Sequence, residues 1–513
     1  MTTAGVLTSL TLPTGITLDS TKRMRAVVMG NLAIIVNSPS ENITVDRFGT
    51  VRLLCPPTPS AVMTLSNTNG GSLSGTFSVK ATFIVKDDFG NLIAESPFSQ
   101  AATSAAITTD YLKVLGVPVC PKTITGLARR LYRTTTGPGS TYFPWLDVDG
   151  NRATTINDDT SDASLQLVAA PTDLGQPPNF ELITVWKNRL WGKSSETKDT
   201  VYYSAIERPF AISSTNAEVI PPANRDNRGI TGFLSRKDEL GIGRADSLHK
   251  ITGSSSSNFT RSTVAENIGI WAPDSCQVIS DVGYFLGNPF GVYSWGPGSV
   301  KSISNERVRA WFDTDTYFNR ARFDQAIGSY YPDLNAYVLL LSAAGSTDLD
   351  RWIMYDIGTG AWWGPHKTGA LTPTGTVTLR DGNDAPMFVL MGGDGKLYKP
   401  QSTKTDGSST AIDYDLETNW FSGGSPTIFK TWLEPKVVTK IQSGGTLTIT
   451  PKIGNLNASA GTAISHDMTL GQQSFRRLGD GNFAQFRIRE NTAAQDAVLY
   501  GLELPFFEIG ERV

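Results

Sequence analysis

Short apolar stretches separated by Gly, Asp, Asn and Ser turns run along most of the chain, and this pattern predicts β-strands. One unit recurs, in which an apolar strand is followed by a polar turn and a second strand with aromatic or Val/Ile residues. Leu32–Val36 followed by Ile43–Val45 is the clearest copy. We read these apolar strands as the first strands of their units. They begin at residues 32, 190, 240, 284, 337 and 387.

The spacing of these units predicts the fold. Successive starts are 158, 50, 44, 53 and 50 residues apart, and four of these steps match a four-stranded propeller blade of about 40–50 residues. The longest step holds about 109 residues more than one blade, which is the size of an inserted β-sandwich. We therefore predict an all-β chain, with a β-propeller of about six blades, a sandwich inserted after the first blade and a C-terminal β-sandwich.

The expected boundaries follow from where the repeat stops and resumes. Residues 1–75 are predicted to form the first blade, 76–170 the inserted sandwich, 171–400 the remaining blades and 401–513 a C-terminal β domain. In that last domain Phe483–Arg489 alternates, so that Phe486 and Ile488 share one face of a strand. Residues 498–507 are expected to form a single closing strand.

Helical periodicity is clear only near residues 302–312. Val308, Trp311 and Phe312 form an i, i+3, i+4 apolar stripe there. Ser304 is expected to cap this helix at its N-terminus.

Composition narrows the class of protein. The chain has 45 basic and 48 acidic residues and a net charge of −3, which argues against a nucleic-acid binder that works through a basic face. Cys55, Cys120 and Cys276 are too few and too scattered for a disulfide framework or a zinc site. No signal peptide and no apolar run of about 20 residues is visible. We expect a protein made in the cytoplasm, without membrane insertion of its own.

Candidate catalytic and ligand motifs fail their requirements. Gly192-Lys193-Ser194 lacks the phosphate-loop glycine five residues earlier, and Gly241-Ile-Gly243 lacks the last glycine of a dinucleotide site, so both are interpreted as turns. The Asp147–Asn151 segment resembles a calcium loop only loosely and is interpreted as a hairpin tip. His249, His366 and His466 lie in separate predicted elements and are interpreted as surface or edge-strand residues. We expect no catalysis, no cofactor and no metal, although a carboxylate pair assembled by folding stays open.

The aromatic pair Trp362–Trp363 follows Gly360. It could bind a sugar, but packing of an outer blade strand against its neighbour is the interpretation that we favour.

Several segments resemble one virion family. These are Ala128-Arg-Arg-Leu-Tyr-Arg-Thr-Thr, Asn188-Arg-Leu-Trp-Gly, Val201-Tyr-Tyr-Ser-Ala, Trp352-Ile-Met-Tyr-Asp-Ile-Gly-Thr-Gly-Ala-Trp-Trp and Gly392-Gly-Asp-Gly-Lys-Leu-Tyr. With the order of parts above, the chain resembles the tail nozzle (tail tube B, or DNA-stabilisation) proteins of short-tailed bacteriophages. The resemblance spans most of the chain and implies that the insert is fibronectin-III-like. Each motif is a structural repeat, not a catalytic signature.

The resemblance implies a structural, non-enzymatic role in the virion tail, assembled in the host cytoplasm. The expected partners are further copies of the chain in a hexameric ring, the adaptor (head-to-tail connector) protein, and tail fibres or spikes. Double-stranded DNA would touch the channel transiently and without sequence specificity. The alternatives are a propeller-type tail-associated glycoside hydrolase or glycan-binding host-recognition protein, and a monomeric or trimeric receptor-binding protein at a fibre tip.

A ring needs two different complementary faces on each subunit. The segment 301–322, with five basic and three acidic residues, and one face of residues 483–489 are candidate contact surfaces. Ordinary solvated charge is the alternative for any one of these residues. The candidate interface residues are Arg307, Arg309, Arg320, Arg322, Arg487 and Arg489.

Overall fold

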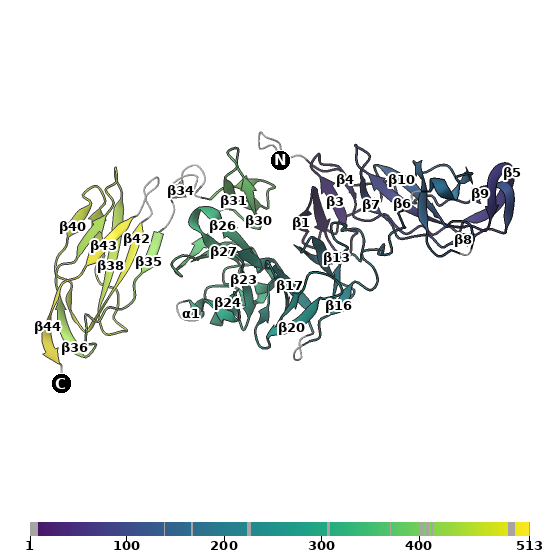
Figure 1. The fold of residues 1–513 in the computed structure, drawn as a ribbon. Coiled ribbons are helices and arrows are strands. Elements are labelled where there is room, and N and C mark those ends of the chain that lie inside the picture. The colour runs from purple at the N-terminus through teal and green to yellow at the C-terminus, as the bar shows by residue number, and fades with distance from the viewer. Residues whose placement is uncertain are drawn as a thin grey trace. The chain divides into compact units, whose positions relative to one another are not determined.

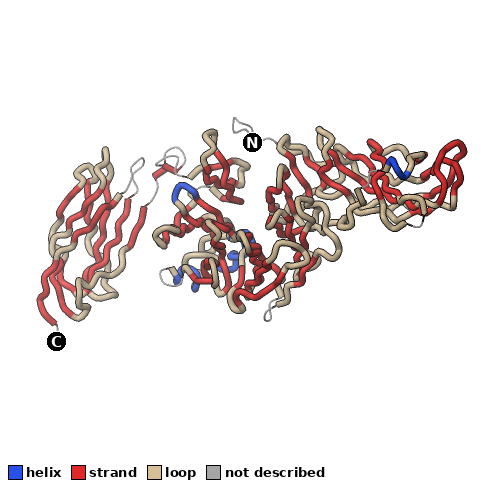
Figure 2. Tube along the Cα trace, in the orientation of Figure 1, coloured by secondary structure: helices blue, strands red, loops and turns tan. Residues whose placement is uncertain are grey.

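The computed structural model describes residues 9–511, apart from 138, 166–167, 223–226, 305–307, 370, 401–404, 407–409, 412–413 and 491–497. Strands make up 49% of the chain and helices 4%, so the predicted all-β fold is confirmed (Figure 2). The chain forms two compact units, Met1–Leu397 and Tyr398–Val513, of which the second begins beside the predicted boundary.

The first unit contains a β-propeller built from successive antiparallel sheets, in which strands pair mainly in chain order (Figure 1). The expected number of about six blades stays a prediction. The first three sheets are β1 (Arg25–Met29), β2 (Leu32–Val36), β3 (Ile43–Asp46) and β4 (Val51–Leu53); β13 (Phe180–Trp186), β14 (Arg189–Ser194), β15 (Thr200–Tyr203) and β16 (Ala217–Val219); and β17 (Ile230–Ser235), β18 (Glu239–Arg244), β19 (Leu248–Thr252) and β20 (Thr260–Ala265).

Three further sheets follow in the same unit. In the first of them β21 and β22 both pair with β23. Their strands are β21 (Gly269–Ile270), β22 (Gln277–Ile279), β23 (Val282–Asn288), β24 (Gly291–Trp295) and β25 (Val300–Ser302); β26 (Ile327–Tyr331), β27 (Ala336–Leu341), β28 (Arg351–Asp356) and β29 (Trp362–Lys367); and β30 (Pro373–Arg380), β31 (Pro386–Gly392) and β32 (Leu397–Tyr398).

The strands that sequence reasoning took as first in each blade are in fact the second. Leu32–Val36 is β2, and Tyr337–Leu341 lies in β27, which is buried along its whole length. A strand with sheets packed on both faces is a continuous apolar run, and this makes it conspicuous. The true first strands, such as Ile327-Gly-Ser-Tyr-Tyr, mix small, polar and aromatic residues.

The insert is a β-sandwich, as predicted, but it begins earlier than predicted. Residues 64–75 form β5, which pairs with β9 inside the insert, so they do not belong to the first blade. The pleat of both sheets turns alternate apolar residues such as Phe77, Val79 and Leu112 into one core. The two sheets are β11 (Phe143–Asp149), β10 (Leu127–Arg133), β6 (Ser78–Lys86), β7 (Leu92–Glu95) and β8 (Ala102–Thr103); and β12 (Thr155–Asp158), β9 (Ile107–Leu115) and β5 (Thr64–Gly75).

The insert shares a core with the first sheet. Ile43 and Leu53 of that sheet pack with Phe83 and Val85 of the insert and with Ile16 of the preceding segment. This core buries one face of the outer strands β2–β4. The opposite face packs on the sheet that starts with β13.

The predicted helix is shorter and begins later than expected. Helix α1 spans Arg309–Asp313, and residues 305–307 lie outside the described part of the chain. Ser304 is not its cap, because its hydroxyl accepts a hydrogen bond from the Val292 amide at 3.0 Å. The predicted stripe is confirmed in that Val308 and Phe312 are buried in a core. Short 3-10 helices occur as η1 (Asp162–Ser164), η2 (Pro273–Ser275), η3 (Arg320–Gln325) and η4 (Pro332–Leu334).

The second unit is also β and has its own core, which includes Trp432, Ile449 and Phe486. The predicted closing strand is wrong, because the chain breaks at Leu504–Pro505 and its two halves pair in different sheets. The strands are β33 (Thr405–Asp406), β34 (Thr410–Ala411), β35 (Tyr414–Glu417), β36 (Ile428–Trp432), β37 (Lys436–Thr439), β38 (Thr446–Gly454), β39 (Ile464–Asp467), β40 (Gln472–Ser474), β41 (Gly479–Gly481), β42 (Phe483–Glu490), β43 (Leu499–Glu503) and β44 (Phe506–Glu511).

No helix among the described residues is long and apolar enough to cross a membrane.

Candidate functional site

Two arginines at the start of β1, one aspartate ahead of β22 and backbone carbonyls from two further sheets meet near the starts of the first strands of the propeller. β1 packs beside β13, β13 beside β17, and β22 beside β26, and the first strands of propeller blades surround a central channel. Arg23 and Arg25 lie at the start of β1, and Asp274 lies in η2, just ahead of β22. We call these three side chains the central cluster.

The central cluster is a two-to-one ion pair. Arg25 holds Asp274 with two parallel contacts, from Nε to Oδ1 at 2.6 Å and from Nη2 to Oδ2 at 2.9 Å. Arg23 Nη1 donates to Asp274 Oδ2 at 2.7 Å. Both carboxylate oxygens are therefore occupied, and the bidentate geometry fixes the guanidinium plane of Arg25.

Backbone carbonyls near the starts of two more strands accept hydrogen bonds from the central cluster. Arg25 Nη1 donates to the carbonyl of Glu181 in β13 at 3.0 Å, and Arg23 Nη1 donates to the carbonyl of Gln325, just before β26, at 3.3 Å. The cluster thus joins the first sheet to three later ones.

Electrostatics keep Asp274 ionised. Burial by itself raises the pKa of this carboxyl, but the charges and hydrogen bonds of Arg25 and Arg23 hold the pKa below its ordinary value. A carboxyl with a lowered pKa and both oxygens engaged is a poor general acid. Beside it, the Glu181 carboxylate pairs with Lys193 of β14.

Sequence reasoning missed the central cluster because Asp274 follows Arg25 by 249 residues and Arg23 by 251 residues. The available signal was weak. Arg23-Met-Arg25 places two cations on one face of the chain as it enters β1, and Pro273-Asp274 starts a 3-10 turn. Neither pair of residues forms a recognisable motif by itself.

The predicted interface arginines near α1 are engaged within the chain. Arg309 Nε lies 2.6 Å from Asp313 Oδ1, and Arg320 Nη1 donates to the Asp313 carbonyl at 2.9 Å. Arg322 donates to the Thr347 carbonyl at 3.4 Å. Arg307 lies outside the described residues. The structure thus gathers Arg309 and Arg320 around Asp313, and their role in an interface stays a prediction.

Arg487 and Arg489 lie on β42 of the second unit, on the exposed face that the alternation predicted. Both pair with Asp415 of β35, Arg487 at 2.6 Å and Arg489 at 3.3 Å. The hydrogen bond from Arg487 lowers the pKa of Asp415. These arginines therefore crosslink two neighbouring strands.

The glycine motifs are strand positions, not the turns that we expected. Gly192 lies in β14, and a Cβ there would approach the Phe180 ring within 2.6 Å. Gly243 lies in β18, where a Cβ would come within 2.3 Å of Ile270. Gly192 allows close packing within one sheet, and Gly243 allows close packing between neighbouring sheets.

One histidine corrects a second expectation. His466 and His366 lie on the edge strands β39 and β29, as expected, whereas His249 lies on β19, between β18 and β20. His249 and His466 are buried. Burial lowers the pKa of both, and also that of His366, and so favours their neutral forms. Among the described residues no group of three or more His, Cys, Asp or Glu side chains could hold a metal ion.

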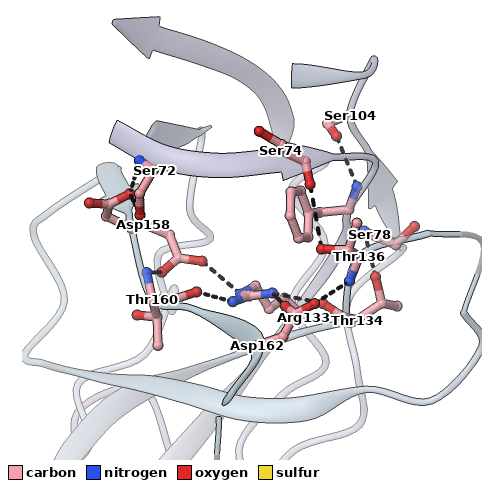
Figure 3. A network of polar contacts seen from close by, with 12 residues as sticks. Ser72, Ser74, Ser78, Ser104, Arg133, Thr134, Thr136, Asp158, Thr160 and Asp162 are labelled. Carbon is pink, nitrogen blue, oxygen red and sulfur yellow. Dashed lines mark hydrogen bonds and ion pairs between the residues drawn. The ribbon is translucent and has the colours of Figure 1, made fainter. Parts of the chain in front are cut away.

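The insert holds a buried polar network around Arg133 (Figure 3). Arg133 Nε lies 2.8 Å from Asp158 Oδ2, with both side chains fully buried, and Nη1 lies 2.8 Å from Asp162 Oδ1. Arg133 also donates to the carbonyls of Thr134 and Thr160. These intrachain contacts indicate that the network holds residues 158–162 against β10.

Comparisons with known proteins give distant similarities. No protein-family model matches the chain, and no curated protein matches it either. Among solved structures, PorZ, a surface component of the type-IX secretion system of Porphyromonas gingivalis, is 8% identical, with 94% of this chain and 75% of that chain covered and a TM-score of 0.25.

Glycoside hydrolases also occur among these structures. A family 43 arabinoxylan arabinofuranohydrolase from Bacillus subtilis is 8% identical, with 95% of each chain covered and a TM-score of 0.22. An exo-β-1,3-galactanase from Phanerochaete chrysosporium is 8% identical, with 96% and 99% covered and a TM-score of 0.18.

These hydrolases contradict the expectation that the chain is not an enzyme, and that expectation is withdrawn. The motifs tested in the sequence were local, whereas the carboxylates of a propeller hydrolase come together only by folding. At TM-scores this low the comparisons assign no activity to this chain.

Proposed function

We propose that the chain is a structural subunit of the tail nozzle of a short-tailed bacteriophage, in which a ring of copies retains packaged DNA and provides its exit channel. The module order supports this proposal. A propeller is interrupted after its first sheet by a sandwich and is followed by a separate β unit. This order, together with the sequence resemblance, carries the assignment.

The packing of the modules suits a subunit that must resist mechanical force. The insert shares a continuous core with the first sheet, and the central cluster ties that sheet to strand starts elsewhere in the propeller. Modules that share a core and ion pairs in this way resist shear better than domains joined by linkers alone. A ring subunit needs this rigidity while DNA moves through the channel.

The charge of the chain also suits a conduit. Its net charge of −3 is spread over 513 residues. A channel lined with many fixed cations would bind phosphates through counterion release and slow a moving polyanion. A nearly neutral chain avoids this retardation.

The test is an averaged image of the assembled particle. We expect six copies of the chain around the tail axis, in contact with the adaptor ring above them. The proposal is wrong if the chain lies in the capsid shell or at a three-fold fibre tip away from the axis.

A second candidate function, glycan binding or hydrolysis, is favoured by one observation. Trp363 on β29 is 55% exposed, whereas the neighbouring Trp362 donates its indole N–H to the Ile303 carbonyl at 2.9 Å and packs in a core. Packing thus explains Trp362 but not Trp363. An exposed indole face can stack on the apolar face of a sugar ring.

Binding of host surface polysaccharide to the intact chain, and release of reducing ends from it, test this second function. We expect Trp363→Ala to weaken binding at least tenfold if the site is real. Tyr317→Ala, at another exposed aromatic residue (46%), is the matched control and should leave binding unchanged. Equal binding by all three proteins would contradict the candidate.

A further inference from the structure

The long strand β5 of the insert contains a bulge at two consecutive glycines. β5 pairs with β9 (Figure 1), and the register sets both Asn69 and the residue four places later opposite Asp110, so residues 70–72 have no partner in it. Gly70 has a φ of +95°, where side chains are strained, and a Cβ at Gly71 would lie 2.2 Å from a backbone nitrogen of β9. The bulge therefore requires glycine at both positions.

This requirement places a glycine directly after an asparagine. Asn69-Gly70 is the only Asn-Gly pair in the 513-residue sequence, and both residues are exposed. The Asn69 side chain makes no hydrogen bond to another described residue, whereas Asn67 on the same strand donates from Nδ2 to Asp110 Oδ2 at 2.6 Å. The Asn69 amide is thus free to turn toward the main chain.

We propose that Asn69 is a modification site, at which the folded chain converts asparagine into aspartate and isoaspartate through a cyclic imide. The Gly70 nitrogen attacks Cγ of Asn69, and glycine favours this step because no Cβ shields its nitrogen. The N–Cγ bond forms and the Cγ–Nδ2 bond breaks. Ammonia leaves with the proton from the Gly70 nitrogen.

Water then opens the imide ring at one of its two carbonyl carbons. Addition at Cγ breaks the new N–Cγ bond, restores the original main chain and leaves an aspartate. Addition at the backbone carbonyl carbon of Asn69 breaks the original peptide bond, so the main chain now runs through the side chain as isoaspartate. The sum consumes one water and releases one ammonia, and nothing is oxidised or reduced.

Either product adds a negative charge opposite a carboxylate. Asn69 and Asp110 face each other across the strand pair, and like charges directly opposite each other destabilise such a pair. We expect the modified insert to open more often at the bulge, where Asp159 accepts a hydrogen bond from the Ser72 hydroxyl at 2.9 Å. The site belongs to the insert and does not depend on the proposed function.

Timed incubation of the folded full chain, near pH 6 and near pH 8, tests the site. Peptide mass spectrometry measures conversion of amide to acid at each asparagine, and an isoaspartate methyltransferase labels the isoaspartate product. We expect Asn69 to convert about tenfold faster than Asn67, whose amide is hydrogen-bonded and whose next residue, Thr68, has a branched side chain. The rate should rise with pH, because the attacking nitrogen must lose its proton.

Three results would overturn the inference. The first is equal conversion at Asn69 and Asn67, and the second is conversion of Asn69 only after the chain has been unfolded in denaturant. The third is aspartate without isoaspartate, since the cyclic imide gives both products.

Two matched variants locate the labelled residue. Asn69→Gln should abolish the isoaspartate label, because its longer side chain would have to close a larger ring. Asn67→Gln, at the exposed asparagine two residues earlier, should leave the label unchanged. A label that persists in Asn69→Gln would place the modification elsewhere and contradict the site.

Hydrogen exchange tests the effect on the strand pair. Amides of β5 and β9 around the bulge should exchange about two- to fivefold faster in the incubated protein and in Asn69→Asp than in fresh protein. Combining Asn69→Asp with Asp110→Asn removes the opposed charge and should restore the original exchange. A rise of equal size in the double variant would show that charge repulsion is not its cause, while the mass spectra decide the modification itself.

Discussion

At the scale of single residues, Asp274 is the side chain that joins the two arginines of the central cluster. It takes hydrogen bonds from two arginines that precede it by about 250 residues, and those arginines reach two further strand starts through carbonyl oxygens. One carboxylate therefore organises contacts among several sheets. Its pairing also makes the stability of the propeller depend on pH.

The substitution Asp274→Asn should lower the free energy of unfolding at pH 7 by about 1.5–3 kcal/mol, the range for hydrogen bonds to charged groups. The folded-state pKa of Asp274 lies below its unfolded value, despite the opposing effect of burial. The stabilisation is thus fully present above about pH 4–5 and is lost as pH falls through the lowered pKa. Denaturant unfolding at pH 7 and pH 3 should show the difference between the two proteins shrink in acid.

Asp238→Asn is the control for this substitution. Its carboxylate is 76% exposed and lies 3.3 Å from Lys187, so the change should stay within about 0.5 kcal/mol. A loss in Asp274→Asn no larger than in this control would show that the central cluster does not stabilise the propeller.

At the scale of elements, glycines in second strands decide how closely neighbouring strands and sheets pack. Gly192, Gly241 and Gly243 face Phe180, Trp295 and Ile270, and each ring or branch occupies the space that a Cβ would need. These positions resemble nucleotide-binding glycines only in spacing. Their function in the fold is close packing between neighbouring strands and sheets.

Gly243→Ala should therefore destabilise the propeller by about 1–3 kcal/mol, the usual cost of overpacking a core. The new methyl group would lie 2.3 Å from Ile270 Cδ1 and 2.5 Å from its Cγ1. Gly382→Ala is the control, because nothing lies within 4 Å of a Cβ there. Thermal unfolding measures both, and equal midpoints for the two variants would contradict the packing role.

At the scale of the whole molecule, the insert and the C-terminal unit differ in how they join the propeller. The insert shares a core with the first sheet through Phe83, Val85, Ile43 and Leu53. The C-terminal unit encloses its own core around Trp432, Ile449 and Phe486. The insert should therefore unfold together with the propeller, and the C-terminal unit by itself.

Calorimetry of the full chain and of the separate pieces 1–397 and 398–513 tests this expectation. Each piece should show one cooperative transition, and the transitions should match those of the full chain within about 2–4 °C. Phe83→Ala should lower only the transition of piece 1–397. A chain that unfolds in a single transition, with neither piece folding alone, would contradict this division.

The sequence by itself determined the all-β class, the propeller, the presence of an insert and most second and third strands. These features are local, because turn residues and apolar runs such as Leu32–Val36 and Tyr337–Leu341 follow from backbone preferences and burial on both faces. The alternation at Phe486 and Ile488 likewise placed Arg487 and Arg489 on the exposed face correctly.

Only the tertiary structure decided what depends on contacts between distant segments. The pairing of β5 with β9 shows that β5 belongs to the insert. Residues 498–507 contribute strands to two different sheets, and the Ser304 hydroxyl accepts a hydrogen bond from the Val292 amide in place of capping a helix. The tertiary structure also brings Arg23 and Arg25 to Asp274. Local patterns record which residues prefer to be buried, whereas pairing partners and charge clusters are set by the path of the chain in space.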